Sequence, residues 1–193
     1  MQGKNTPVPN ADRSAAMRSR LIACARKLFV ANGYAETSTP EIVREAKVTR
    51  GALYHHFKDK QDLFCAVVTA EAEALAKSVE KEALAAGQDA MSAGSLAFFQ
   101  AMSKPGRARL LLIDGPAVLG TQEMARIDAG GGRRTLRDGL SSAASGLEPA
   151  ELDALADALS AAYDRAALAI AEGHDPDPYV RAMSRLIGSL KSG

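Results

Sequence analysis

Apolar residues recur along most of this chain at intervals of three and four, the spacing that gathers them on one face of a helix. A first helix is predicted from about Ser14 to Asn32, and Gly33 is suited to end it because glycine accepts the backbone angles of a helix terminus. No convincing alternating strand is found, and no Asn-Gly or Asp-Gly turn has alternating apolar residues on both sides. The pattern therefore predicts an all-α protein. The apolar face of the first helix comprises Met17, Leu21, Ala25, Leu28 and Phe29.

Two short helices with a tight connection are predicted over about residues 38–57. Ser38 and Glu41 have the spacing of a capping box at the start of the first, and Thr49 is placed to cap the second. Asp59 can then cap a long helix. Two short helices joined by three or four residues form a helix-turn-helix. The side chains expected to hold this unit together are Ile42, Val43, Val48, Leu53 and Phe57.

The rest of the chain is predicted to form a helical bundle, with Gly- and Pro-containing breaks between its helices. These helices are expected over about residues 88–103, 106–113, 121–128, 133–145, 149–172 and 176–191. The predicted organisation is a loose arm over residues 1–12, a helix-turn-helix domain over 13–62 and a second helical domain over 63–193.

The composition of the 193 residues, 47% of them hydrophobic, allows a sizeable core. No run of about 18 apolar residues is present, and the first residues lack an apolar signal region. A soluble cytoplasmic protein with no membrane partner is therefore expected. The two cysteines, Cys24 and Cys65, lie in predicted helices among apolar neighbours and are expected to be reduced, packed thiols.

The net charge of +1 is unevenly distributed. Residues 1–60 carry 11 Lys or Arg and 5 Asp or Glu, and the remaining residues carry 13 and 18, which gives +6 and −5. The net positive charge of residues 1–60 favours a polyanionic partner, although a basic surface that only faces solvent fits the charge equally well.

Neither a metal site nor a cofactor site is indicated. His55 and His56 are adjacent, so they point about 100° apart on a helix, whereas two metal ligands on one helix need a spacing of three or four. No His-x3-His or Cys-x2-Cys pair occurs.

An enzyme is not indicated either. In "LLLIDGPAVLGTQ", residues 110–122, Gly115 and Gly120 have phosphate-loop spacing, but Thr121 stands where that motif needs lysine, so a turn between helices is favoured. No G-x-S-x-G is present, and no spacing joins Ser, His and Asp into a catalytic site.

The helix-turn-helix segment carries donors and ring edges of the kind that contact phosphates and bases. Ser38, Thr39 and Lys60 lie at helix N-termini, where hydroxyls, exposed N–H groups and the lysine charge favour phosphate. Gly51 leaves room for close approach of the backbone. The candidate DNA-binding residues are Ser38, Thr39, Thr49, Arg50, Gly51, Tyr54, His55, His56 and Lys60.

The segment "RLIACARKLFVANGYAETSTPEIVREAKVTRGALYHHFKDKQDLF" resembles the DNA-binding domain of the tetracycline-repressor (TetR) family. The resemblance covers about a quarter of the chain, from about Ser14 to Phe64. One departure is Lys47, where the family usually has Gly or another small residue, and another is Pro40. "PGRARLLLIDGPAVLG" gives a weaker resemblance to a subgroup of the family.

The resemblance implies a homodimeric transcription regulator, usually a repressor, on a nearly palindromic DNA operator. It places Thr49, Arg50 and Gly51 in the major groove, and Tyr54 and His56 where the family contacts backbone or bases. A dimer sets its two recognition helices one DNA turn apart, about 34–36 Å, or somewhat further.

The resemblance also implies a dimer interface on the last two long helices, about 149–172 and 176–191. Their apolar stripes fit this role, but they fit intrachain core equally. The stripes are Leu152, Leu155, Leu159, Tyr163, Ala166 and Ile170 on one helix, and Val180, Met183, Leu186, Ile187 and Leu190 on the other.

In the family a small-molecule effector binds the second domain and moves the long helix that begins near Lys60. The sequence names no particular effector. Residues that suit an apolar pocket, or else ordinary core, are Met91, Phe98, Phe99, Met102, Met124 and Tyr163.

Three functions stay open on the sequence. The first is a repressor released by an effector. The second is a constitutive or architectural DNA-binding protein without an effector, which a closed second domain would favour. The third is an enzyme or ligand carrier that has lost DNA binding, against which the residues of the helix-turn-helix argue.

Overall fold

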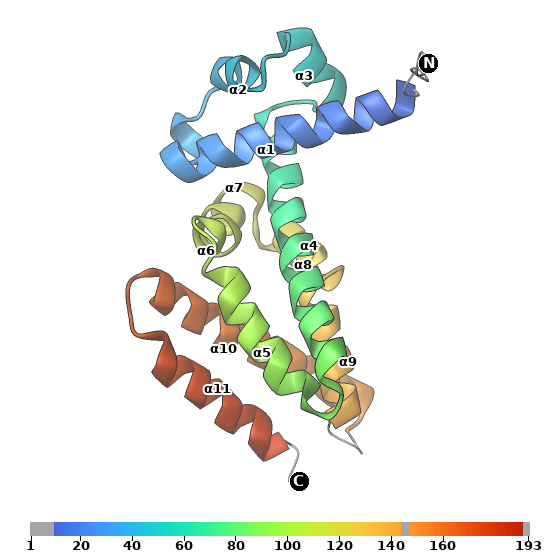
Figure 1. Ribbon diagram of the computed structural model, residues 1–193, viewed down its shortest axis with the longest axis vertical. Coiled ribbons are helices and arrows are strands. Elements are labelled where there is room, and N and C mark those ends of the chain that lie inside the picture. The colour runs from blue at the N-terminus through green and yellow to red at the C-terminus, as the bar shows by residue number, and fades with distance from the viewer. Residues whose placement is uncertain (1–9, 144–146, 191–193) are drawn as a thin grey trace, which may run out of the picture. The chain divides into compact units, whose positions relative to one another are not determined.

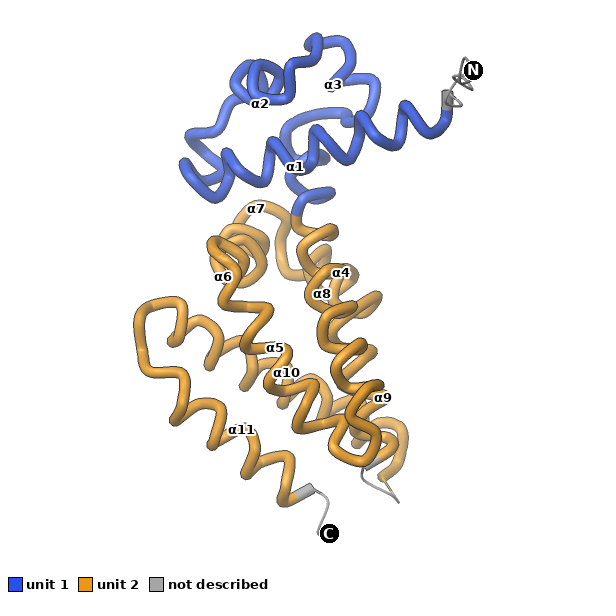
Figure 2. The backbone as a smooth tube through the Cα atoms, viewed as in Figure 1, with its two compact units in different colours: residues 1–67 blue, residues 68–193 orange. Residues whose placement is uncertain are grey.

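The computed structural model describes residues 10–143 and 147–190, and the chain forms two compact units, Met1–Val67 and Val68–Gly193 (Figure 2). Every regular element in the described ranges is a helix, which confirms the all-α prediction (Figure 1). None of these helices combines the length and apolarity needed to cross a membrane. The domain boundary predicted after residue 62 and the division after Val67 both lie within one helix, α4 (Lys60–Ala86).

Helix α1 (Asn10–Glu36) is longer than predicted. Its first residues overlap the end of the arm predicted over residues 1–12, and residues 1–9 lie outside the described chain. Asp12 in the first turn interacts favourably with the helix dipole, which supports the earlier start. The predicted stop at Gly33 is a break within the helix, since Gly33 has φ 83° and ψ 169°.

Helices α2 (Thr39–Ala46) and α3 (Arg50–His56) form the predicted helix-turn-helix, followed by α4. The turn places Lys47 in the left-handed conformation at φ 52°, which explains why a small residue suits this position. The Lys47 N–H donates to the carbonyls of Val43 and Arg44, so the turn closes the end of α2.

The core of unit 1 consists of side chains from α1, α2, α3 and the start of α4. The Phe64 ring meets the Phe29 and Tyr34 rings edge-on, with ring centroids 5.1 and 4.9 Å apart. The predicted faces of α1 and of the helix-turn-helix are thereby joined in one cluster. The fully buried apolar members are Leu21, Ala25, Phe29, Ile42, Ala46, Leu53, Leu63, Phe64 and Val67.

Unit 2 continues with α4 and contains the remaining helices. Their bounds are η1 (Gly87–Asp89), α5 (Ala90–Met102), α6 (Arg107–Arg109), η2 (Leu110–Asp114), α7 (Gly115–Leu119), α8 (Thr121–Ala129), α9 (Gly132–Ala143), α10 (Pro149–Ala171) and α11 (Pro176–Leu190). Residues 144–145 and 191, predicted as helix ends, lie outside the described chain.

The turn predicted within residues 110–122 is confined to Gly120, at φ 81° and ψ 161°, because η2 is a π-helix that runs directly into α7 and α8 begins at Thr121. Pro116 lies in the first turn of α7, where its missing N–H is not needed. A Cβ at Gly115 would meet the Leu110 carbonyl oxygen at 2.8 Å and Met124 Sδ at 2.9 Å. The glycine therefore marks a close contact between helices.

The apolar stripes of α10 and α11 form intrachain core together with α5 and α9. Of the stripe residues, Leu152, Leu159, Tyr163, Ala166, Met183 and Ile187 are buried, whereas Leu186 is exposed. The prediction that these stripes form the dimer interface is therefore wrong for the buried members, because the chain's own helices cover them. The side chain of Leu190 lies outside the described part.

A buried ion pair joins α4 to the segment after α5 within unit 2. Arg107 Nε donates to Glu71 Oε2 at 2.9 Å, and both side chains are nearly inaccessible to solvent. The Arg107 guanidinium also donates to the Ala101 carbonyl at 2.9 Å, and Lys104 Nζ reaches Glu71 Oε1 at 3.2 Å. A buried carboxylate is tolerated here because two cations neutralise it.

Replacing Lys47 by glycine should stabilise the protein by about 0.5–1 kcal/mol, because it removes the strain of a side chain at positive φ. The free energy of unfolding from urea titration measures the gain. Lys47→Ala is the matched control: it removes the charge but keeps the strain, and should show no gain. Equal stabilities of the glycine and alanine variants would contradict this explanation.

Candidate nucleic-acid interface

The N-terminus of α2 is capped by the side chains of Ser38 and Glu41. Ser38 Oγ accepts from the Glu41 N–H at 3.4 Å and donates to Glu41 Oε2 at 2.8 Å, while the Ser38 N–H donates to the same carboxylate oxygen at 2.8 Å. Hydrogen bonds from the Ser38 backbone and side chain lower the pKa of Glu41. The predicted capping box is confirmed. The Ser38 hydroxyl is thus engaged locally, which is at odds with the phosphate contact predicted for it.

Helix α3 begins at an exposed cap. Thr49 Oγ1 accepts from the Ala52 N–H at 3.2 Å, as its capping role predicts. A Cβ built on Gly51 would meet nothing nearer than Thr49 Oγ1 at 3.9 Å. The fold itself therefore does not require glycine at this position, and the first turn of α3 is open to solvent.

Three of the predicted residues meet on the surface formed by α2 and α3. The Arg50 guanidinium lies over the Tyr54 ring, 5.4 Å from its centroid. Hydrogen bonds with the Thr39 side chain and the Arg50 side chain lower the pKa of Tyr54. The Tyr54 side chain is 39% exposed, so this cluster presents a cation, a phenol and a hydroxyl to solvent.

Lys60 is occupied within unit 1. Its ammonium donates to the carbonyls of Tyr34, Ala35 and Thr37 at 2.9, 3.3 and 3.0 Å. The same group lies 4.3 Å from the centroid of the Tyr34 ring. An ammonium has three hydrogens to donate, and these carbonyls use them all. The phosphate contact predicted for Lys60 is therefore at odds with the structure, which gives the side chain a positioning role.

The adjacent histidines lie at the end of α3. His55 is exposed and His56 is half-buried, with ring centroids 5.2 Å apart. No group of three or more His, Cys, Asp or Glu side chains suited to a metal ion occurs within residues 10–143 and 147–190. The His55 ring is thus open to solvent at the end of α3, whereas the His56 ring is partly covered.

Two exposed lysines next to α3 were missed in the sequence analysis. Lys47 precedes the helix and Lys58 follows it. Their positions flanking the predicted recognition helix were a usable signal. Each brings a positive charge to the ends of the surface that carries Arg50 and Tyr54.

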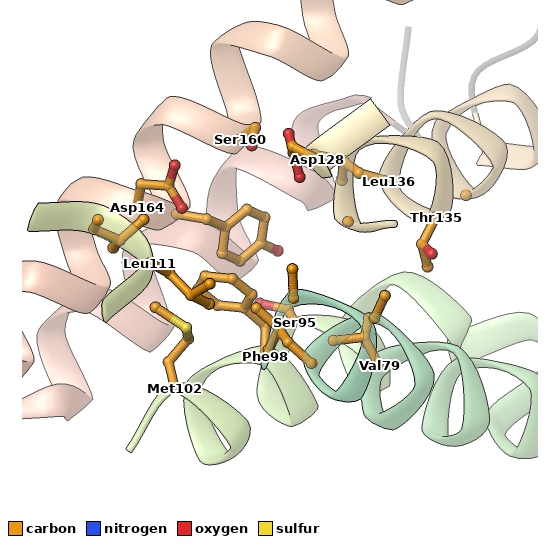
Figure 3. Close-up of a pocket in the computed structure, with 18 of the residues that line it drawn as sticks. Val79, Ser95, Phe98, Met102, Leu111, Asp128, Thr135, Leu136, Ser160 and Asp164 are labelled. Atoms are coloured by element: carbon orange, nitrogen blue, oxygen red, sulfur yellow. The ribbon is translucent and has the colours of Figure 1, made fainter. Parts of the chain in front are cut away.

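Unit 2 contains a cavity of about 410 Å³ between α4, α5, the η2–α7 segment, α8, α9 and α10 (Figure 3). This volume is within the usual range for small-molecule sites. Of the six predicted pocket residues, five line it: Met91, Phe98, Met102, Met124 and Tyr163. The sixth, Phe99, does not, because it is directed into the core with α10 and α11.

Two carboxylates on the cavity wall were also missed. The pKa of Asp164 is raised to about 6, mainly because the side chain is partly buried and to a smaller extent because the negative charge of Asp128 is near. Burial also raises the pKa of Asp128, although a 3.2 Å hydrogen bond from the Arg133 N–H acts to lower it. Asp164 directly follows the stripe residue Tyr163, so the helical pattern alone gave no sign that it faces a cavity.

Comparisons with known proteins identify the class of regulator to which this fold and surface belong. Residues 21–67 match the model of "Bacterial regulatory proteins, tetR family", and residues 88–193 match the model of "Tetracyclin repressor-like, C-terminal domain". The second match alone covers more than half of the chain, so the chain belongs to the TetR family. Its members are transcriptional regulators and not enzymes.

Curated relatives match the N-terminal part. The chain is 35% identical over 66 residues to the HTH-type transcriptional regulator QacR of Staphylococcus aureus, which is 34% of this chain and 35% of that protein. It is 51% identical over 47 residues to the regulator AcrR of Shigella flexneri, which is 24% of this chain and 22% of that protein. These alignments thus span about a third or less of the two relatives.

A solved structure matches nearly the whole chain. A TetR-family transcriptional regulator from Pectobacterium atrosepticum is 28% identical, with a TM-score of 0.68 over 95% of this chain and 94% of that one. Both units therefore have the fold of this family.

Lys60→Met should lower the free energy of unfolding by about 2 kcal/mol, because three carbonyls lose a charged donor. Lys58→Met is the matched control, since it removes an exposed ammonium two residues away. Urea titration of both variants measures the difference. If both variants unfold at the same urea concentration as the wild type, Lys60 does not hold the end of α1.

Asp164→Asn should stabilise the protein by about 1–2 kcal/mol at pH 8, because the wild type holds a partly buried carboxylate there. The raised pKa means that the wild type loses stability as the pH rises through about 4 to 6, and that the gain of the variant shrinks towards zero near pH 3. Thermal unfolding across this range measures it. Asp153→Asn, which removes a partly buried ion pair with Arg137 outside the cavity, is the control. A gain that is independent of pH would contradict the assignment.

Proposed function

We propose that this protein is a homodimeric repressor that binds a palindromic DNA operator through α3 and is released by a small-molecule effector bound in unit 2. The observation that carries the DNA-binding part is the exposed cluster of Thr39, Arg50 and Tyr54 beside the open backbone at Gly51. As a DNA-binding regulator of a bacterial family, it would act in the cytoplasm.

The chemistry of α3 suits the major groove. The contact with the Tyr54 ring restricts the Arg50 side chain, which lowers the entropy lost when its guanidinium pairs with a guanine. Thr49 and the N–H groups of the first turn are placed for phosphate oxygens, as are the charges of Lys47 and Lys58. His55 and His56 extend the same surface.

The proposed dimer uses α10 and α11, but through faces other than the predicted stripes. On α10 the exposed residues include Ala154, Ala158 and Ala161, whose small side chains permit close helix packing. On α11 Leu186 is 48% exposed. A second copy that covers these faces would present two α3 helices to successive turns of a palindrome.

The proposed effector site is the cavity of unit 2. Leu75 and Val79 of α4 belong to its wall, so a ligand that changes the position of α4 acts on the helix that begins at Lys60. The effector must bind the DNA-incompetent state more tightly, and it shifts the equilibrium only by that difference. An open cavity of about 410 Å³ argues against the alternative of a constitutive regulator with a closed second domain.

Selection of binding sites from a random duplex pool at about physiological salt tests the proposal. The expected result is a palindrome that is enriched by the wild type and lost with Tyr54→Ala. Enrichment of a single half-site would contradict the dimer. Equal recovery of all sequences by both proteins would contradict sequence-specific recognition by α3.

Arg50→Ala and Lys58→Ala should weaken operator binding in different ways. Arg50→Ala should reduce the preference at one or two base pairs by about 10–100-fold, because a base contact is lost. Lys58→Ala should weaken binding to all sequences and reduce the slope of log affinity against log salt by about 1, because a phosphate contact is lost. Fluorescence anisotropy with point-mutated operators separates the two effects. Identical base preferences in both variants would contradict the docking of α3.

A further inference from the structure

The charged side chains that line the cavity of unit 2 are all acidic. Within the described chain, the lining includes Asp128 and Asp164 but no Lys, Arg or His. Most of the remaining wall is apolar, with Phe98 and three methionines among its residues. Such a wall makes the electrostatic potential inside the cavity negative, because little polar matter screens the two carboxylates.

Asp164 has no ion-pair partner among the described residues, and Arg133 offsets the charge of Asp128 only in part. Asp164 makes no hydrogen bond or ion pair with any described residue. Asp128 accepts the Arg133 N–H, but the Arg133 guanidinium donates instead to Asp157 at 2.5 Å. A partly buried carboxylate without an ion-pair partner still costs stability, so the site gains most from a ligand that brings positive charge.

A second, independent feature of the wall points to a ligand. Ser95 is only 5% exposed, lines the same cavity, and its hydroxyl has no hydrogen-bond partner among the described residues. The neighbouring Tyr163 has a raised pKa because it is buried. The Ser95 hydroxyl lies close enough to lower that pKa slightly, but the two side chains do not form a hydrogen bond. In Figure 3 Ser95 and Phe98 lie across the cavity from Asp128 and Ser160.

We propose that the effector of this protein is an organic ammonium compound with an aromatic or aliphatic frame, held with its cationic group at Asp128 and Asp164 and a polar substituent at Ser95. Phe98 and Tyr163, whose rings are 5.0 Å apart, receive the frame, and the flexible methionine side chains adapt to its outline. A bare metal ion would leave this apolar wall unused, and the described residues contain no group of three or more His, Cys, Asp or Glu side chains that could hold one.

The inference rests on the proposed effector site and adds the charge of the ligand. Three probes of nearly the same shape test it: 1-naphthylmethylammonium, 1-naphthylmethanol and 1-naphthoate. The chain has no tryptophan, so naphthalene fluorescence reports binding directly. The full-length wild type should bind the cation about tenfold more tightly than the alcohol, and the alcohol more tightly than the anion.

Asp164→Asn and Asp128→Asn should each remove most of this preference by lowering affinity for the cation about tenfold, with the alcohol unchanged. Unchanged binding of the alcohol also shows that the variants are folded. Asp153→Asn, on the same helix but outside the cavity, should behave as the wild type. Ser95→Ala should weaken probes that carry a hydrogen-bonding substituent.

Equal affinities for the three probes, no binding of any of them, or a cation preference that survives in the Asp128→Asn/Asp164→Asn double variant would overturn the inference. Probe affinities and operator release are separate measurements, and the second uses the same probes to measure release of the selected operator.

Release by the alcohol or the anion, without a cation preference, would overturn the inference and keep the proposed effector site. Cation binding with the predicted dependence on both aspartates, but without operator release, would support the inference and count against effector control.

Discussion

The ammonium of Lys60 holds together the end of α1 and the start of α4, and the surface proposed to meet DNA depends on that interaction. Gly33 breaks α1, and the carbonyls that follow would otherwise lack donors. Lys60 satisfies three of them, and the buried Thr37 hydroxyl donates to the Gly33 carbonyl at 2.7 Å. Both flanks of the helix-turn-helix are thereby fixed, so Arg50 and Tyr54 are in position before DNA arrives, and little ordering remains to oppose binding.

Helix α4 gives the proposed effector a physical route to that surface. Its first residues, Lys60–Val67, belong to unit 1 and the remainder belongs to unit 2, where it lines the cavity. The buried pair of Glu71 with Arg107 fixes α4 to the segment that leads into the π-helix, and the π-helix lines the cavity through Leu111 and Leu112. A ligand that changes the packing of this wall therefore acts on a continuous helix whose other end holds α1.

The sequence was sufficient where local chemistry decides the structure. The starts of α2, α3 and α4 were predictable because a cap is formed by residues three positions apart, as between Ser38 and Glu41. The sequence was insufficient where contacts between distant segments decide the environment of a side chain. The carbonyls that occupy Lys60 lie more than twenty residues earlier, and the stripes of α10 and α11 look the same whether another helix or a second chain covers them. Asp164 gave no signal, since only the surrounding helices make its position a cavity wall.

The amide spectrum of the isotope-labelled full chain, titrated with a duplex obtained by selection, tests the central claim most directly. If α3 reads the operator, the largest shifts fall on residues 49–56 and on Thr39, and a scrambled duplex of equal length and charge produces distinctly smaller ones. Shifts that spare α3, or shifts of the same size with both duplexes, would contradict the account.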